Sequence, residues 1–209
     1  MLLLETMVVC QEDLLRQCLG KETAVITGAS RGGTSMVAYA LIKLGYPLLS
    51  SGQRTHEHEE ILAAWDSDSK RASVVAANNS NHVRWGFKLP EAALHPDWCA
   101  QNLRDPIFIM VYRNPLAVGR SKLSRNPERW EESADALEGA IKQGLKMMVS
   151  GSEYLRRNVP VVLVDFDAVK IHPNVFLKEI AQVFELTIPS KERLDEIGLA
   201  IALPGYNVV

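Results

Sequence analysis

The sequence has few cysteines and no excess of charge of either sign. Its three cysteines, Cys10, Cys18 and Cys99, are odd in number and show no C-x-x-C spacing. This pattern is typical of reduced thiols in a cytoplasmic protein rather than of a disulfide framework or a zinc site. The formal net charge is -2, which argues against broad binding to a nucleic-acid backbone or an anionic membrane. The composition therefore predicts a cytoplasmic protein with no nucleic-acid partner and no metal site.

The sequence also has no apolar run long enough to cross a membrane. Residues 1–18 begin with four apolar side chains but then include Glu12, Asp13 and Arg16, a pattern that favours an amphipathic helix over a signal peptide. With 47% hydrophobic and 23% charged residues, the chain has the profile of one ordinary globular domain. We therefore expect residues 1–209 to form a single domain without a membrane segment.

Strand-like and helix-like segments alternate along the chain. Short apolar runs rich in β-branched residues indicate strands, and apolar residues at helical spacing indicate helices. The predicted strands span residues 23–27, 46–49, 83–88, 106–112 and 159–165. The predicted helices span residues 35–44, 61–65, 90–103, 114–123, 128–157 (broken near Gly144 or Gly151) and 173–184, and residues 67–82 are predicted as a loop. This alternation predicts a three-layer α/β/α domain around a central parallel sheet.

A glycine-rich segment joins the first predicted strand to the helix that follows. Gly28 and Gly33 stand at the spacing of the two glycines in the motif G-x-x-x-x-G-K followed by Ser or Thr, and Ser35 takes the hydroxyl position. Backbone N–H groups in such a turn, together with a helix N-terminus, favour binding of a phosphate. Thr34 replaces the lysine that an NTP hydrolase needs, so a GTPase or an ordinary nucleotide kinase is disfavoured. Arg31 is the obvious substitute cation.

The same segment also looks like the opening of the short-chain dehydrogenase fingerprint. Residues 27–32 match its start, but the next glycine would fall where Thr34 stands, and no acidic residue ends the following strand. The Tyr-x-x-x-Lys pair, Tyr39 and Lys43, lies on the first predicted helix, where it cannot serve as the catalytic pair. An NAD(P)-dependent oxidoreductase of this kind is therefore the runner-up.

Arg113 follows the most continuous apolar strand, and Ser121 comes eight residues later in the next predicted helix. Ligands bind at the C-terminal ends of the strands in open α/β sheets. We therefore expect Arg113 at the same edge as the glycine-rich segment. Its fork of N–H donors suits a phosphate, and Ser121 can add a hydroxyl from the helix.

Together these two segments resemble the sulfotransferases that use 3′-phosphoadenosine 5′-phosphosulfate (PAPS). The first family motif, R-x-G-T followed by Ser or Thr, is matched by Arg31, Gly32, Gly33, Thr34 and Ser35. The second motif, Arg-Asn-Pro or Arg-Asp-Pro with a Ser eight residues after the Arg, is matched by Arg113, Asn114, Pro115 and Ser121. The resemblance implies a P-loop-like nucleotide-binding fold, in which the first motif holds the 5′-phosphosulfate and the second holds the 3′-phosphate.

The resemblance further implies an enzyme that moves a sulfuryl group from PAPS, as co-substrate, to a hydroxyl or amine of a small-molecule or carbohydrate acceptor. The other product is adenosine 3′,5′-bisphosphate, and no metal is implied because no nucleotide polyphosphate has to be bridged. The missing lysine is then understandable, since such transfer depends mainly on positioning and electrostatic stabilisation. A non-catalytic nucleotide-binding module is the remaining alternative. The acceptor and the oligomeric state stay open.

The catalytic base must lie outside the position that many cytosolic members of the family use. They carry a histidine in K-x-H after the mid-chain strand, whereas here Leu and Pro follow Lys88. An acceptor loses a proton as it attacks, so a His or Glu is expected within hydrogen-bond reach. The segment after the second predicted strand supplies Glu57 as first choice, with His56 or His58 next. Lys88 is expected to contact the sulfonate or the bridging oxygen.

Overall fold

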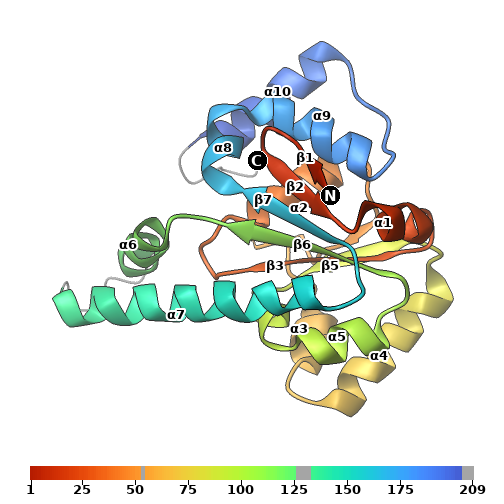
Figure 1. Ribbon diagram of the computed structural model, residues 1–209, viewed down its shortest axis with the longest axis horizontal. Coiled ribbons are helices and arrows are strands. Elements are labelled where there is room, and N and C mark those ends of the chain that lie inside the picture. The colour runs from red at the N-terminus through yellow and green to blue at the C-terminus, as the bar shows by residue number, and fades with distance from the viewer. Residues whose placement is uncertain (53–54, 126–132, 204–209) are drawn as a thin grey trace.

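A seven-stranded sheet forms the centre of the computed structural model, which describes residues 1–52, 55–125 and 133–203 (Figure 1). The strand order is β1-β2-β7-β6-β3-β5-β4, in which β3 to β7 are parallel to one another and β1 and β2 form an antiparallel hairpin beside β7. The strands are β1 (Leu2–Leu3), β2 (Met7–Cys10), β3 (Thr23–Gly28), β4 (Leu48–Leu49), β5 (Trp85–Lys88), β6 (Pro106–Tyr112) and β7 (Val161–Asp165). The predicted α/β class with a mostly parallel central sheet is confirmed.

Helices cover both faces of this sheet. Helices α2, α8, α9 and α10 pack on one face, and α3, α4, α5 and α7 lie on the other (Figure 1). The helices are α1 (Glu12–Cys18), α2 (Thr34–Lys43), α3 (Glu59–Ala64), α4 (Asp68–Asn81), α5 (Pro96–Asn102), α6 (Pro115–Arg125), α7 (Ala134–Ser152), α8 (Phe166–Ile171), α9 (Pro173–Val183) and α10 (Lys191–Ala202), with 3-10 turns η1 (Pro90–Leu94) and η2 (Glu153–Arg156). The predicted three layers are therefore present.

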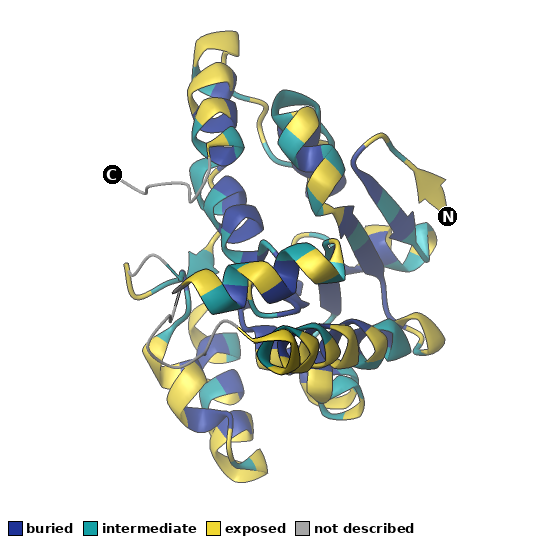
Figure 2. Cartoon of the chain, turned by 90° about the vertical axis from the view of Figure 1, so that its left-hand side faces the viewer, coloured by how far each residue is buried: buried dark blue, intermediate teal, exposed yellow. Residues whose placement is uncertain are grey.

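The two central strands are buried along nearly their whole length, because helices cover both of their faces. All six residues of β3 and all but the last of β6 are buried. Alternate strand residues point to opposite faces, so Ala24 and Ile26 join the core under α2, whereas Val25 joins Trp85 and Phe87 on the opposite side. Figure 2 shows the resulting pattern of buried strands between helices that bury one face each.

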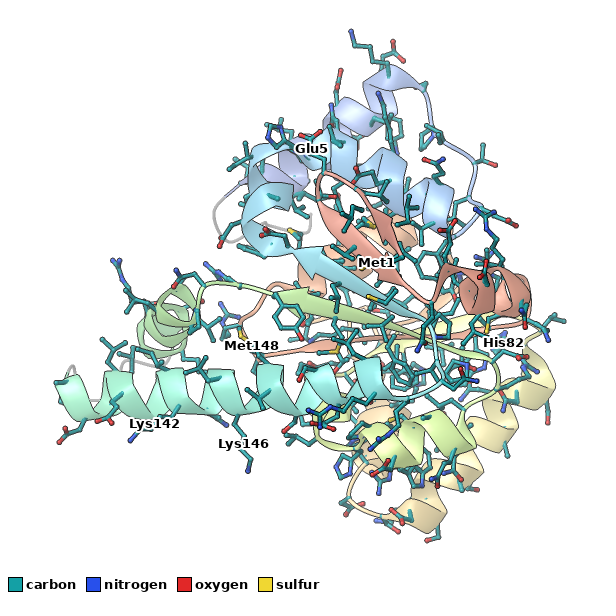
Figure 3. All side chains as sticks on the ribbon, viewed as in Figure 1. Met1, Glu5, His82, Lys142, Lys146 and Met148 are labelled. Atoms are coloured by element: carbon teal, nitrogen blue, oxygen red, sulfur yellow. The ribbon has the colours of Figure 1, made fainter. Side chains whose placement is uncertain are left out.

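Helix α7 illustrates packing by a single face. Met148 points toward the sheet, whereas Lys146 points away from it (Figure 3). The predicted helix over residues 128–157 contains α7, which runs through Gly144 without a break and ends just after Gly151; the first residues of that prediction lie outside the described part of the chain. Neither α7 nor any other described helix combines the length and apolarity needed to cross a membrane.

The predicted amphipathic helix over residues 1–18 is wrong. The segment forms the antiparallel hairpin of β1 and β2 and only then the short helix α1. All four residues of β2 pair with β7. The β-branched side chains of Val8 and Val9 favour a strand, and the exposed edge of β7 supplies hydrogen-bond partners that a local sequence pattern does not reveal.

The predicted loop over residues 67–82 is also wrong, because α4 spans most of it. The buried residues of α4, which are Arg71, Val75 and Asn78, lie on one face at helical spacing. Two of these three residues are polar, so the periodicity is hidden in a hydrophobicity pattern.

The predicted helix over residues 90–103 divides into η1 and α5 at His95. His95 precedes Pro96, and the residue before a proline is disfavoured in the α-helical conformation. The chain therefore turns at this point and resumes as a separate helix.

Candidate functional site

The glycine-rich segment turns tightly between β3 and α2, at the C-terminal edge of the sheet. Gly28, Arg31 and Gly33 have φ values of 140°, 70° and 103°, which suit glycine far better than other residues. A Cβ on Gly28 would lie 2.7 Å from the carbonyl oxygen of Val111, so β3 and β6 approach this closely only because the residue is glycine. Such a turn places backbone N–H groups and the positive end of α2 at the sheet edge, where they favour an anion.

Arg31, Arg113 and Ser121 form a hydrogen-bonded chain across this edge. Arg113 Nη1 donates to the carbonyl of Arg31 at 2.9 Å, and Arg31 Nε donates to Ser121 Oγ at 3.3 Å. Strand β6 lies beside β3 in parallel register, so the residue that follows β6 emerges next to the loop. The fold thus brings together three predicted nucleotide-binding residues from distant parts of the sequence.

The other predicted loop residues lie at the start of α2. Gly32 N–H donates to the carbonyl of Ala29 at 2.7 Å and closes the turn. The side chain of Thr34 is buried, and Ser35 Oγ donates to the carbonyl of Thr55 at 3.1 Å. Ser35 therefore connects the glycine-rich segment to the chain that carries the predicted catalytic base.

Phe166 is absent from the sequence-based predictions, yet it packs against both motifs. The Arg113 guanidinium lies over its ring, 4.4 Å from the centroid, and a Cβ on Gly33 would overlap the same ring. Tyr112 and Asp165 are paired in the register of β6 and β7, so the residues that follow them, Arg113 and Phe166, emerge side by side. The one sequence signal available is the position of Phe166 directly after a buried parallel strand.

A cavity of about 450 Å³ lies beside Arg113. Burial lowers the pKa of the Arg113 guanidinium, and the nearby carboxylate of Asp167 offsets part of this effect. The cavity wall combines apolar strand residues with carboxylates and is lined by Leu4, Glu5, Thr6, Met7, Val8, Tyr112, Arg113, Asn114, Leu163, Val164, Asp165 and Asp167. Within the described residues, no three His, Cys, Asp or Glu side chains are grouped so that they could hold a metal ion.

Lys88 ends β5 and forms an ion pair with Glu57, with Lys88 Nζ 2.5 Å from Glu57 Oε1. The Lys88 side chain is only 4% exposed, whereas that of Glu57 is 23% exposed. Burial lowers the pKa of Lys88, while the hydrogen bond and the charge of Glu57 act in the opposite direction. The charged form of Lys88 therefore depends on Glu57, because a buried cation without its partner is costly.

The two neighbouring histidines lie differently. His56 is buried and has a positive φ of 54°, and its ring lies 6.2 Å from that of Tyr39 on α2. Burial lowers the pKa of His56, and the positive charges of Lys88 and Lys43 lower it further. His58 is half-buried and is the N-cap residue of α3. Of the three candidate bases, Glu57 is thus the one that forms an ion pair with Lys88.

Comparisons with known proteins agree with this architecture. No family model matches the sequence, and no curated protein matches it. The sulfotransferase STF1 of Mycobacterium tuberculosis is 13% identical, with a TM-score of 0.56 over 90% of this chain and 73% of that chain. A sulfotransferase of Alicyclobacillus acidocaldarius is 14% identical, with a TM-score of 0.52 over 88% of this chain and 92% of that chain.

A third solved structure, the sulfotransferase domain from the curacin biosynthetic pathway, is 12% identical, with a TM-score of 0.50 over 84% of this chain and 77% of that chain. Identities this low establish a shared fold and leave the activity to be argued from the site itself. This chain has the fold of the sulfotransferases.

Proposed function

We propose that this protein is a PAPS-dependent sulfotransferase that acts on a hydroxyl or amine of a small-molecule or carbohydrate acceptor. The observation that carries the proposal is the hydrogen-bonded chain from Ser121 through Arg31 to Arg113. It joins the two sequence motifs at the ligand-binding edge of the sheet. The two motifs must be adjacent in such an enzyme, because one nucleotide carries both the 5′-phosphosulfate and the 3′-phosphate.

The unsatisfied donor of Arg113 supports a phosphate at this position. Among the described residues, Arg113 Nε is buried and has no hydrogen-bond partner. A buried N–H without an acceptor costs free energy, and a phosphate oxygen is a strong acceptor for a guanidinium. Arg113 Nη1 is already held by the carbonyl of Arg31, which orients the remaining donors. The adjoining cavity of about 450 Å³ has room for the nucleoside.

The glycine-rich segment is assigned to the phosphosulfate end of the nucleotide. Gly32 and Gly33 bring their backbone close to the ligand, and Thr34 and Ser35 begin the helix whose positive end faces it. The Ser35 hydroxyl is engaged with the carbonyl of Thr55. We therefore assign Ser35 to positioning the segment with Glu57, and we assign phosphate binding to its backbone N–H.

Glu57 is assigned as the general base and Lys88 as the cation beside the transferred group. One carboxylate oxygen of Glu57 accepts from Lys88, which leaves the other oxygen to take the proton of the acceptor. Lys88 is almost fully buried, and a cation in such a site stabilises developing negative charge more strongly than one in water. When bound, PAPS supplies the sulfuryl group and leaves as adenosine 3′,5′-bisphosphate.

Thermal unfolding with added nucleotides tests the proposal. A ligand that binds only the folded state raises the melting temperature by mass action, so adenosine 3′,5′-bisphosphate should raise it more than ATP or NADPH. A larger effect of NADPH would favour an NAD(P)-dependent oxidoreductase and overturn the proposal of a sulfotransferase. An acceptor screen with labelled PAPS follows, and bisphosphate binding without transfer to any acceptor would favour a non-catalytic module.

A further inference from the structure

We propose that Phe166 is a positioning residue that fixes how Arg113 meets the 3′-phosphate of the nucleotide. The inference rests on the proposed function, and it assigns a role to a residue outside both sequence motifs. Phe166 itself makes no polar contact with a phosphate, because its ring has no hydrogen-bond donor. Its effect is exerted through the orientation of Arg113.

The contacts of Phe166 connect the two motifs through one aromatic ring. The guanidinium of Arg113 lies over the ring at 4.4 Å from its centroid, a distance within the range of a cation–π interaction. On the same ring, Gly33 approaches so closely that any Cβ at that position would overlap it. Movement of Phe166 would therefore disturb Arg113 and the loop together.

Helix α8, which begins at Phe166, is itself held in place at both ends. Asp165 caps the helix by accepting hydrogen bonds from the N–H groups of Asp167 at 2.9 Å and Ala168 at 3.1 Å. One turn further on, Lys170 Nζ donates to three consecutive carbonyls at the end of α10, those of Ile201, Ala202 and Leu203. Phe166 is therefore carried by a helix that is held at both ends, and its partly buried side chain packs against the hydrophobic core.

Such a support matters for arginine because its side chain has many rotamers. Ordering a free arginine on binding costs conformational entropy, and stacking on Phe166 together with the bond to the Arg31 carbonyl removes much of that freedom beforehand. This lower entropy cost favours only those ligands that bind to Arg113. Nucleotides with a 3′-phosphate should depend on Phe166, whereas adenosine 5′-monophosphate, which lacks that group, should not.

Isothermal titration of adenosine 3′,5′-bisphosphate and adenosine 5′-monophosphate tests this selectivity. Phe166→Leu keeps apolar bulk against Gly33 but removes the aromatic face, so it should weaken bisphosphate binding about fivefold. Binding of the monophosphate should change less than about twofold. Phe166→Tyr keeps the ring and should retain wild-type affinity for both ligands. Equal weakening of both ligands, or no weakening of either, would overturn the inference.

Two further variants separate positioning from general destabilisation. Phe176→Leu removes a fully buried ring from α9 on the same side of the sheet, so it should lower the melting temperature without changing the preference for the 3′-phosphate. In an Arg113→Met background, Phe166→Leu should cost less than about twofold, because the cation over the ring is gone. A full fivefold loss in that background would overturn the inference.

The proposed function can fail independently of this inference. Wild-type protein that binds neither nucleotide would overturn both, whereas tight bisphosphate binding that survives Phe166→Leu unchanged would overturn the positioning role alone.

Discussion

The glycine-rich edge and the segment before α3 hold their polar groups by different means. At the edge of β3 and β6, backbone turns and contacts between distant residues fix Arg31 and Arg113, and the register of two buried strands sets their positions. In the segment after β4, Glu57 is held by the ion pair with Lys88, by a hydrogen bond from Ser51 N–H to its own carbonyl, and by the bond from Ser35 to the neighbouring carbonyl of Thr55. The residues of the first region follow strands of the sheet, whereas those of the second lie in a connecting segment that contacts the sheet through side chains.

This contrast predicts which substitutions should affect nucleotide binding and which should affect turnover. A sheet edge that backbone hydrogen bonds define is rigid and can bind a constant ligand such as a nucleotide. A connecting segment outside the sheet can differ in sequence without loss of the fold, which suits the part of a site that faces a variable acceptor. Substitutions in the first region should therefore affect binding, and those in the second should affect turnover.

The sharpest test of this contrast is Glu57→Gln, for which we expect the largest effect. Gln keeps an oxygen acceptor for Lys88 but is not a base, so turnover should fall about 1000-fold, while bisphosphate affinity stays the same. Steady-state kinetics and titration calorimetry measure the two quantities. Glu60→Gln, in the exposed first turn of α3, is the matched control and should stay active. Full activity of Glu57→Gln would remove Glu57 from the mechanism.

Arg113→Ala, in contrast to Glu57→Gln, should change the affinity for adenosine 3′,5′-bisphosphate. On the proposed function, loss of the guanidinium removes the charge-assisted contacts to the 3′-phosphate, so bisphosphate binding should weaken about 100-fold. The control is Arg120→Ala, an exposed arginine of α6, which should bind normally. The comparison between the two regions breaks down if Arg113→Ala binds the bisphosphate as tightly as wild type.

Gly33→Ala tests whether the loop backbone is as constrained as its geometry indicates. The substitution forces a Cβ into a positive φ and against Phe166, so it should lower the free energy of unfolding by about 2–4 kcal/mol. Gly139→Ala is the counterpart in an open position of helix α7, where the same change should stabilise by about 0.5–1 kcal/mol. Urea denaturation measures both, and equal effects would contradict a rigid loop.

The smallest expected effect is a pH dependence from His56. Because burial, Lys88 and Lys43 lower its pKa in the folded protein, the unfolded chain takes up the proton at a higher pH than the folded one. Protonation of His56 therefore favours the unfolded state. The free energy of unfolding is unaffected by this group above the ordinary histidine pKa of about 6.5 and decreases as the pH falls below it.

Unfolding in urea at pH 7.5 and pH 5.5 measures this loss. His56→Gln should lose less stability between the two values than wild type, whereas His82→Gln, an exposed histidine at the end of α4, should behave as wild type does. An unchanged difference in His56→Gln would show that the pH dependence arises at other groups.

Much of the fold is predictable from the sequence where a segment carries its own pattern. The strands β3 and β6 are predicted correctly because they are continuous apolar runs, buried on both faces. The turn between β3 and α2 is predicted correctly from the spacing of its glycines. The hairpin of β1 and β2 escapes prediction because its stability depends on pairing with β7. Helix α4 escapes because Arg71 and Asn78 occupy part of its buried face.

The candidate site divides in the same way. Arg31, Arg113 and Ser121 stand in recognisable motifs, so their proximity is expected before any coordinates are known. Phe166 belongs to no motif, and only the parallel register of β6 and β7 brings it under Arg113. Likewise, the sequence names three candidate bases, and the ion pair with Lys88 singles out Glu57 among them.

The sequence by itself determined the α/β class, most of the strands and helices, and the two motifs, because periodicity and glycine positions act over a few neighbouring residues. Only the tertiary structure decided which side chains meet. Strand register and the packing of α8 join residues that are far apart in the chain, and the free energy of those contacts exists only once the sheet has formed.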